Sequence, residues 1–445
     1  MNVLISGASV AGPSLAWWLA RTGARVTILE KNPTLMPIGQ NIDVHGTSVI
    51  IAQKMGILQD IRDFNTTEVG VKFVDSKGEA FAEMPLKPGV APSPTNELEI
   101  LRGDLAKVFY NATKDSPNIE YRFGTTVKRV ISNNDEAVEV ELSDGRVEKY
   151  DLLVAADGQW SKLRKANFPP DAVQLRDYNL FAVYWTTDRL PIDTNWGTIY
   201  QATGSRVIGT RPDPYGNLRA SLMFVPPTES QRKAWDLVAR SDKQAQVDLV
   251  RKEYAGAGWE TDRLLAGLDK ADDFYFHAIQ QNRMSEWSQN RIVCLGDAAW
   301  APTPLTGMGA SLAMIGGYVL AGELTKLGPA EHPRRALEAF DKALRPFVEK
   351  IQDVPTFVPR LVHPYSSVER WFTQSLLSLL SKVVRIPWVG KWLYEPIDKE
   401  DYVLRDYPRL KAVEVEVDVE VKSTESKQMP YIDSSAVSYA SPGRL

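Results

Sequence analysis

Hydrophobic and polar residues change their spacing twice within the first thirty positions of the chain. Residues 3–5 form a short apolar run, typical of a buried strand, and apolar residues within 15–20 recur at helical spacing. A second apolar run, 25–29, ends at Glu30, and a glycine-containing turn, 7–12, separates the first strand from the helix. The pattern predicts a βαβ unit, the context in which such a turn binds a dinucleotide.

The turn has the residues that a diphosphate site requires. Gly7 permits a sharp turn, Gly12 lets helix and strand pack closely, and Ser9 is small enough for the backbone to approach phosphates. The helix N-terminus adds unsatisfied amide donors and a partial positive charge. Glu30 follows the second strand, where an acid binds ribose hydroxyls. The alternative is an α/β protein that merely opens with a glycine-rich turn.

The rest of the chain predicts further strands and helices. Alternating polarity, as in antiparallel strands with one solvated face, is found at 71–74, 79–84, 181–189, 197–201, 206–211 and 218–225. Other strands are expected at 119–121, 126–131, 138–142, 151–156, 273–278 and 291–298. Helices are expected at 48–56, from 99 onward with Asp104 as a candidate cap, and at 231–254, 259–270, 310–326, 335–351 and 368–394.

These groups predict that the first domain is discontinuous, because its sheet is interrupted by a second sheet and resumes near Arg291. We expect an α/β fold with a Rossmann-like domain and an inserted antiparallel-sheet domain. C-terminal helices and a polar tail of disordered composition follow. The ranges are 1–70, 100–165 and 285–345 for the first domain, 71–99 and 166–284 for the second, 346–410 for the helices and 411–445 for the tail.

Composition narrows the class of protein. A net charge of -4 and a pI near 5.8 indicate no excess of basic residues, which argues against nucleic acid as the main partner. The single cysteine, Cys294, excludes an internal disulfide framework and fits a reducing compartment. With neither a signal-like start nor an uninterrupted apolar stretch of spanning length, we expect a cytoplasmic chain without a transmembrane segment. His277 and His363 lack partners at metal-ligand spacing, so we expect no metal site.

Three apolar strands end in small or acidic residues, at 7–12, at Asp157-Gly158 and at Gly296-Asp297. Ligands of open α/β sheets lie outside the carboxyl ends of the strands, so the three ends could converge on one extended cofactor. With these motifs in this order, the chain resembles the FAD-dependent aromatic hydroxylases of the p-hydroxybenzoate hydroxylase type, which are single-component flavoprotein monooxygenases. Residues 39–46 look most like the tetracycline-inactivating branch and natural-product tailoring enzymes.

The resemblance covers roughly residues 1 to 345 and implies a Rossmann-like FAD-binding domain with an inserted substrate domain. Asp297 would bind the ribityl chain, although the residue could also be a helix cap. Residues 304–310 would lie under the isoalloxazine. The full set of implied FAD-binding residues is Gly7, Ser9, Ala11, Gly12, Glu30, Lys31, Asn41, Arg102, Asp157, Gly158, Asp297, Pro304, Gly307, Gly309 and Ala310.

Three residues are candidates for the flavin- and substrate-facing wall. The resemblance places Asp43 near the isoalloxazine and the substrate, and Gln201 and Arg206 on the sheet that forms the substrate floor. Their alternatives are a loop solubiliser for Asp43 and a solvated strand face for the other two. Trp300 replaces a frequent His and Ser311 a usual Asn, which could change the pocket wall or solvent access.

The implied activity is an NAD(P)H-consuming monooxygenase, with NADPH the favoured donor. One oxygen atom of O2 would reach an electron-rich aromatic, polyketide or alkaloid substrate through a flavin hydroperoxide. FAD should be bound non-covalently, because Cys294 lies inside a strand and no His falls in a flavin-facing motif. The alternatives are an FAD-dependent reductase of the same fold and a non-catalytic flavin-binding protein; the halogenase signature W-x-W-x-I-P is absent. Monomer and dimer both stay open.

The C-terminal stretch 368–394 combines apolar, aromatic and basic residues and is interrupted at Pro387. Two interpretations are open. The stretch could be a helix packed across the two domains, which we favour because the surface of the first domain would otherwise be uncovered. It could instead be a peripheral membrane anchor, since Trp and basic residues suit that role.

Overall fold

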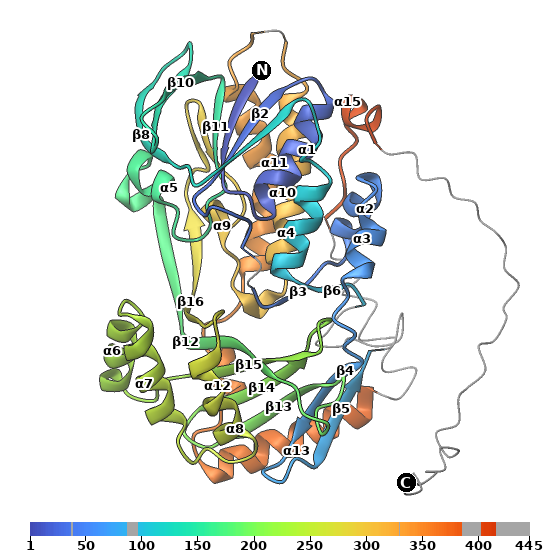
Figure 1. Ribbon diagram of the computed structural model, residues 1–445, viewed down its shortest axis with the longest axis vertical. Coiled ribbons are helices and arrows are strands. Elements are labelled where there is room, and N and C mark those ends of the chain that lie inside the picture. The colour runs from blue at the N-terminus through green and yellow to red at the C-terminus, as the bar shows by residue number, and fades with distance from the viewer. Residues whose placement is uncertain (37–38, 87–96, 329, 385–401, 415–445) are drawn as a thin grey trace, which may run out of the picture.

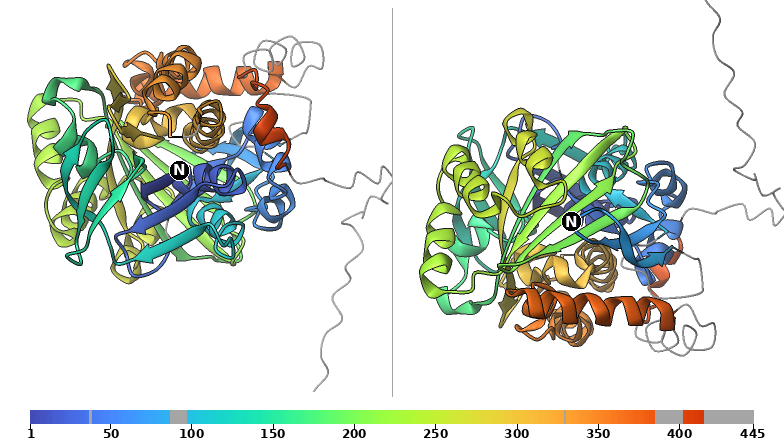
Figure 2. Two further views of the ribbon diagram at one scale, coloured as in Figure 1. Left: turned by 90° about the horizontal axis from the view of Figure 1, so that it is seen from above. Right: turned by 90° about the horizontal axis from the view of Figure 1, so that it is seen from below.

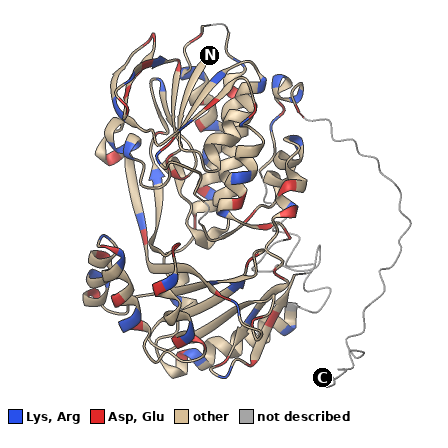
Figure 3. Cartoon of the chain, viewed as in Figure 1, with Lys and Arg blue, Asp and Glu red and all other residues tan. Residues whose placement is uncertain are grey.

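The computed structural model describes residues 1–36, 39–86, 97–328, 330–384 and 402–414. It has an upper and a lower body, joined by two long antiparallel strands, β12 (Val173–Asp188) and β16 (Tyr275–Met284) (Figure 1). Lys and Arg residues are interspersed with Asp and Glu residues along the chain of both bodies (Figure 3).

The upper body contains a six-stranded sheet in the order β17-β18-β11-β1-β2-β7. All neighbours in it pair in parallel except β17, which pairs antiparallel to β18. The strands come from four separate parts of the chain, which is the mixed α/β architecture that the sequence predicts. Their bounds are β1 Asn2–Ser6, β2 Arg25–Glu30, β7 Ile119–Phe123, β11 Leu152–Ala155, β17 Ser288–Gln289 and β18 Ile292–Cys294.

Helices and two small sheets complete the upper body (Figures 1 and 2). The small sheets are β10-β9-β8 (β8 Val127–Asn133, β9 Val138–Leu142, β10 Val147–Tyr150) and β3-β6 (β3 Asn41–Asp43, β6 Glu99–Leu101). The helices are α1 Ala11–Arg21, α2 Thr47–Lys54, α3 Leu58–Asp63, α4 Arg102–Asn111, α5 Lys162–Asn167, α9 Asp297–Trp300, α10 Gly309–Leu324, α11 Arg334–Gln352 and α15 Pro408–Lys411.

The lower body is a seven-stranded sheet in the order β16-β12-β15-β14-β13-β4-β5. One face packs on α6, α7 and α8, where Trp235, Val250 and Leu264 form a core with Tyr200 and Ile208 of the sheet. The remaining bounds are β4 Gly70–Val74, β5 Ala80–Pro85, β13 Gly197–Ala202, β14 Arg206–Pro212, β15 Asn217–Phe224, α6 Glu229–Val238, α7 Lys243–Tyr254, α8 Thr261–Ala266, α12 Val358–Val362 and α13 Ser367–Val384. Short 3-10 turns lie at η1 Pro170–Ala172, η2 Leu268–Lys270 and η3 Pro304–Thr306.

Several predicted elements differ from the structure. Residues 99–101 form strand β6, because they pair with β3, and α4 begins only at Arg102. Asp104 therefore lies inside the helix and is not its cap; its carboxylate accepts a hydrogen bond from the Tyr215 hydroxyl at 2.6 Å. The expected helix 231–254 is two helices, since Asp242 caps α7 by accepting from the Ala245 amide at 2.9 Å.

The C-terminal predictions are tested only in part. Within the part of the chain described, no helix has both the length and the apolar character needed to cross a bilayer. Residues 385–394 of the expected helical stretch and residues 415–445 of the expected tail lie outside the described residues. The assignment of residue ranges to domains stays a prediction.

Candidate functional site

The carboxyl ends of four parallel strands lie at the same edge of the six-stranded sheet. Backbone hydrogen bonds continue past the strand ends: Gly7 donates to Leu29, Ala156 to Ser6 and Leu295 to Ala155, all at 2.8 to 2.9 Å. The turn 7–12, Glu30, Asp157-Gly158 and Asp297 are therefore brought together, as the sequence predicts. This edge is where an open α/β sheet binds a ligand.

Gly7 and Gly12 are required by close approach of the backbone. Gly7 has a φ of +117°, and a Cβ built on it would lie 2.2 Å from the carbonyl oxygen of Ala156. A Cβ on Gly12 would lie 2.2 Å from the carbonyl oxygen of Gly7. Both distances are far below contact, so α1 can begin this close to β1 and β11 only with glycine at these positions. Ala11 is buried beside them and Ser9 is partly exposed.

Glu30 turns its carboxylate toward the glycine-rich turn. One oxygen accepts from the Ala8 amide at 3.2 Å and the other from the Asn32 amide at 3.0 Å. An acid is thus held at the end of β2, beside the first backbone amides of the turn. Lys31, the next residue, is exposed.

Asp297 is the first residue of α9, and only Leu295 and Gly296 separate it from the end of β18. Burial raises the pKa of its carboxyl, and the positive charge of Arg102 opposes that rise. Asn282 on β16 donates to the Asp297 carbonyl at 3.0 Å and to the Gln159 carbonyl at 2.8 Å. Asn282 of β16 therefore connects the loop after β11 to the loop after β18 by hydrogen bonds.

Arg164 contributes to the same connection; it ends the stretch 155–164, which resembles the family motif implicated in FAD and NAD(P)H binding, but it was not singled out as a site residue. The residue is buried on α5, and its guanidinium donates to the carbonyls of Ala298 at 2.5 Å and Gln159 at 2.9 Å. Ser161 caps α5 by accepting from the Arg164 amide at 2.9 Å. Both residues follow Asp157, and Ser161 precedes Arg164 by three positions, which is the spacing of a helix cap and the amide that it accepts from.

Arg102 joins the two bodies electrostatically. It is the first residue of α4, and a Cβ on Gly39 would lie 2.6 Å from its Cβ, so this segment also needs glycine. The charge of Arg102 acts on Asp297 and on Tyr275 and His277 of β16. Burial, followed by Arg102, lowers the pKa of His277 to about 4, so this imidazole is neutral at physiological pH.

The loop before α10 has a strained backbone. Thr303 has a φ of +80°, which is unusual for a β-branched residue, and its hydroxyl accepts from the Leu305 amide at 3.1 Å. Pro304 is exposed in η3, and α10 starts at Gly309 without a side-chain cap among the described residues. No described atom would lie within 4 Å of a Cβ on Gly309. A Cβ on Gly307 would lie 3.8 Å from the Asp43 carboxylate, so β3 faces this loop.

A buried ion network lies next to Asp43, and sequence reasoning missed it. Arg211 on β14 is 2.7 Å from both the Glu68 and the Glu99 carboxylates, whose side chains are each 1% exposed. Asn41 donates to Glu99 at 2.6 Å, and Glu99 pairs with Asp43 across β3 and β6. Burial would lower the pKa of Arg211, but the Glu99 and Glu68 carboxylates and then Asp43 raise it. These residues are far apart in the sequence, so no local pattern predicts that they form a network.

Gln201 and Arg206 lie on opposite faces of the lower sheet. Gln201 is opposite Val207 in the β13–β14 register, whereas Arg206 is opposite Ala202. Arg206 donates to the carbonyls of Thr203 at 2.9 Å and Glu253 of α7 at 2.8 Å, on the helix-covered face. The structure therefore places Arg206 away from Asp43, against the prediction of a substrate-facing role.

Gln201 lies on the face that also presents Arg211, since alternate residues of a strand share a face and the register pairs Gln201 with Val207. The side chain is buried and donates to the Val362 carbonyl at 2.8 Å. Gln201 therefore holds the end of α12 against the sheet, and its substrate-facing role stays a prediction.

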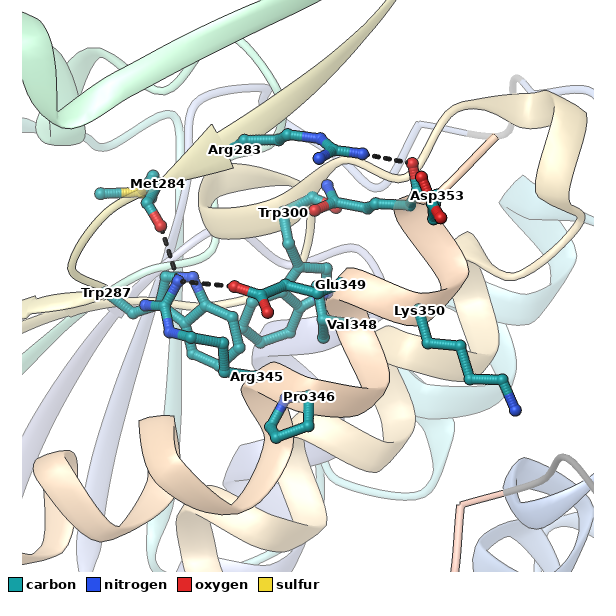
Figure 4. A pocket seen from close by; sticks show the side chains of 11 residues that line it. Arg283, Met284, Trp287, Trp300, Arg345, Pro346, Val348, Glu349, Lys350 and Asp353 are labelled. Atoms are coloured by element: carbon teal, nitrogen blue, oxygen red, sulfur yellow. Dashed lines mark hydrogen bonds and ion pairs between the residues drawn. The ribbon is translucent and has the colours of Figure 1, made fainter. Parts of the chain in front are cut away.

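Trp300 and Ser311 are both buried, and their effect on the substrate pocket stays a prediction. The Trp300 ring is buried 4.4 Å from the Trp287 ring and beside Phe340. Trp300 and Trp287 line a pocket of about 480 Å³ between the end of β16 and α11 (Figure 4). Ser311 is hydrogen-bonded to the Ser48 hydroxyl at 2.9 Å and so connects α10 to α2.

Residues 1–354 match the family described as FAD binding domain, and the chain belongs to that family. It is an FAD-dependent monooxygenase of the aromatic hydroxylase type, as the resemblance implies. No group of three or more His, Cys, Asp or Glu residues in the described ranges could hold a metal ion.

Relatives and solved structures agree with this assignment. The chain is 34% identical to "Monooxygenase CTB7" of Cercospora beticola, over 88% of this chain and 93% of that one. It is 32% identical to "Flavin-dependent monooxygenase eupH" of Phoma sp, over 82% and 89% of the two chains. Among structures, tetracycline destructase Tet(51) has a TM-score of 0.72 at 26% identity, covering 91% of this chain and 99% of that one.

Proposed function

We propose that the protein oxidises NAD(P)H, with NADPH the favoured donor, and transfers one oxygen atom of O2 to an electron-rich aromatic, polyketide or alkaloid substrate. The observation that carries this proposal is the position of Asp43. It lies between the loop 303–309, which follows the cofactor-type strand ends, and the lower-sheet face that presents Arg211. The similarity to a tetracycline destructase supports a polycyclic substrate for this region.

The residues at the strand ends fit FAD. The closely packed turn at Gly7 and Gly12 leaves backbone amides for a diphosphate, and Glu30 stands where ribose hydroxyls would bind. Asp297 would accept from the ribityl chain, and the uncapped start of α10 would donate to the pyrimidine edge. When bound, FAD supplies the electron transfer and the activation of O2. The chain binds and orients the cofactor, and Asp43 faces the substrate.

We expect Asp297→Ala to weaken FAD binding about tenfold to a hundredfold, because a hydrogen bond to a charged group contributes roughly 1.5–3 kcal/mol. Fluorescence titration of the apoprotein with FAD measures the dissociation constant. Asp171→Ala is the matched control, since Asp171 is exposed in η1, away from the strand ends. Unchanged FAD affinity in a folded Asp297→Ala protein would reject the ribityl role.

We expect acid precipitation to release FAD into the supernatant. Cys294 is fully buried in β18, and burial raises the pKa of its thiol well above the usual range, so the thiolate needed for covalent attachment is not available. Absorbance of supernatant and pellet after precipitation measures the distribution of the yellow colour. Colour that stays with the pellet would show a covalent bond.

The proposed reaction is tested by NAD(P)H oxidation with FAD-loaded protein, aromatic, polyketide and alkaloid candidates, and isotopically labelled O2. We expect one candidate to accelerate NADPH oxidation and to gain a single labelled oxygen atom, measured by mass spectrometry. Substrate reduction that proceeds equally without O2 would identify a reductase instead. A yellow protein that oxidises neither NADPH nor NADH with any candidate would identify a non-catalytic flavin-binding protein.

A further inference from the structure

Helix α13 (Ser367–Val384) turns its apolar side away from the protein. Its exposed residues recur at positions separated by three or four, which places them on one helical face. Val368 is 76% exposed and Trp371 is 70% exposed, values that leave most of each side chain in solvent. The full apolar stripe of α13 is Val368, Trp371, Phe372, Leu376, Leu379 and Leu380.

The opposite side of α13 is mostly polar and faces the protein. Ser381 is buried, Thr373, Gln374 and Ser378 are half-buried, and the helix packs against β5. Figure 2 (right) shows α13 along the outer edge of the molecule. This orientation is the reverse of an ordinary surface helix, which buries its apolar face. The expectation that the apolar surface of 368–384 packs across the two bodies is therefore wrong for the described residues.

The charge of the residues around the apolar stripe indicates which kind of partner the stripe binds. The described residues 355–384 contain three basic residues, Arg360, Arg370 and Lys382, and one acidic residue, Glu369, although the whole chain has a net charge of -4. A second copy of α13 would bring the same positive charge against itself, because a two-fold interface pairs identical surfaces. An anionic lipid surface complements the charge and also accepts apolar and Trp side chains.

We propose that the apolar stripe of α13 docks on the surface of a bilayer containing anionic lipids. Val368, Trp371 and Phe372 lie in the first half of the helix and Leu376, Leu379 and Leu380 in the second, so α13 would lie flat at the interface. The polar side of the helix would stay against β5. No spanning segment is needed for this mode of binding.

The test places a fluorescent label inside the stripe. Ser375 is exposed between Phe372 and Leu376, and the native cysteine, Cys294, is fully buried, so Ser375→Cys directs an environment-sensitive thiol dye to α13. FAD-loaded, labelled protein is titrated with phosphatidylcholine vesicles with and without phosphatidylglycerol. We expect a blue shift with phosphatidylglycerol vesicles, a much weaker one with phosphatidylcholine alone, and reversal by high salt.

Two variants make the result specific. Leu237→Cys is the matched control, because Leu237 is 72% exposed on α6 and should show no shift with either vesicle. Trp371→Ser/Leu379→Ser in the labelled protein should reduce vesicle partitioning at least about tenfold, since two large apolar side chains are removed. Thermal unfolding with FAD bound checks that this variant is folded.

Three outcomes would overturn the proposal. The first is a labelled α13 that shows no shift with either vesicle. The second is equal, salt-insensitive binding to both vesicles, which would remove the anionic partner. The third is a concentration-dependent shift without vesicles, together with a dimer mass by light scattering that Trp371→Ser/Leu379→Ser abolishes. That result would assign the stripe to a second copy of the chain.

Discussion

Gly7→Ala should unfold more easily than the native protein and should lose FAD. The substitution places a Cβ 2.2 Å from the Ala156 carbonyl oxygen and forces a residue with a side chain to adopt a φ of +117°. Overpacking costs about 1–3 kcal/mol and a sparsely populated backbone conformation about 1–3 kcal/mol. We therefore expect a loss of roughly 2–6 kcal/mol in the free energy of unfolding.

Gly23→Ala separates the destabilisation caused by the backbone conformation from the destabilisation caused by overpacking. Gly23 also has a positive φ, +92°, but no described atom would lie within 4 Å of its Cβ. This variant should show only the conformational part of the loss and should keep its FAD affinity. Urea unfolding of the apoproteins and titration with FAD measure both quantities. Equal stability and equal FAD affinity in the two alanine variants would contradict the close approach at Gly7.

The first sheet and its cofactor edge could be predicted because their signals are local. Residues 3–5 are apolar without interruption and Val26, Ile28 and Leu29 dominate the second strand, a pattern typical of parallel strands with both faces largely covered. Gly7 and Gly12 are separated by a fixed turn, so their packing role can be inferred from spacing. Asp297 follows the carboxyl end of β18, and this position in the sequence predicts that it lies at the same edge of the sheet as the glycine-rich turn.

Elements that depend on distant partners could not be located as well. Residues 99–101 are too few to show a period, and they become a strand because β3 lies alongside. β12 begins at Val173, not at the predicted 181, because a register shift between Asp177 and Phe181 interrupts its alternation. Asn179 within that shift has a φ of +50°, which is typical of such an irregularity.

The substrate-facing side of the lower sheet was only partly predictable. Alternating polarity shows that a strand has two different faces, but it does not show which of them the helices cover. Arg206 and Arg211 are both polar strand residues, but the register places them on different faces. Only the fold brings Arg211 to Glu68 and Glu99, which are 143 and 112 positions away along the chain. Asp43 was identified by resemblance, and its ionic neighbours were not.

Arg211→Met should destabilise the protein by about 3–5 kcal/mol, the effect of removing one partner from a buried ion pair. The two carboxylates left behind are each 1% exposed, and they lie next to Asp43 without the guanidinium that separates their charges. Urea unfolding of the FAD-free protein measures the loss. Arg146→Met is the control, because Arg146 pairs with Asp144 at the surface and such pairs contribute about 0–1 kcal/mol.

A rescue variant distinguishes unpaired charge from lost packing. Glu68→Gln and Glu99→Gln, added to Arg211→Met, remove both buried charges and keep side chains of similar volume. The amide oxygen at position 99 can still accept from Asn41 and Thr66, which donate to Glu99 at 2.6 and 2.7 Å. We expect the triple variant to be more stable than Arg211→Met alone. A triple variant no more stable than Arg211→Met would show that Arg211 acts through packing, because the carboxylate charges would then contribute nothing to the loss.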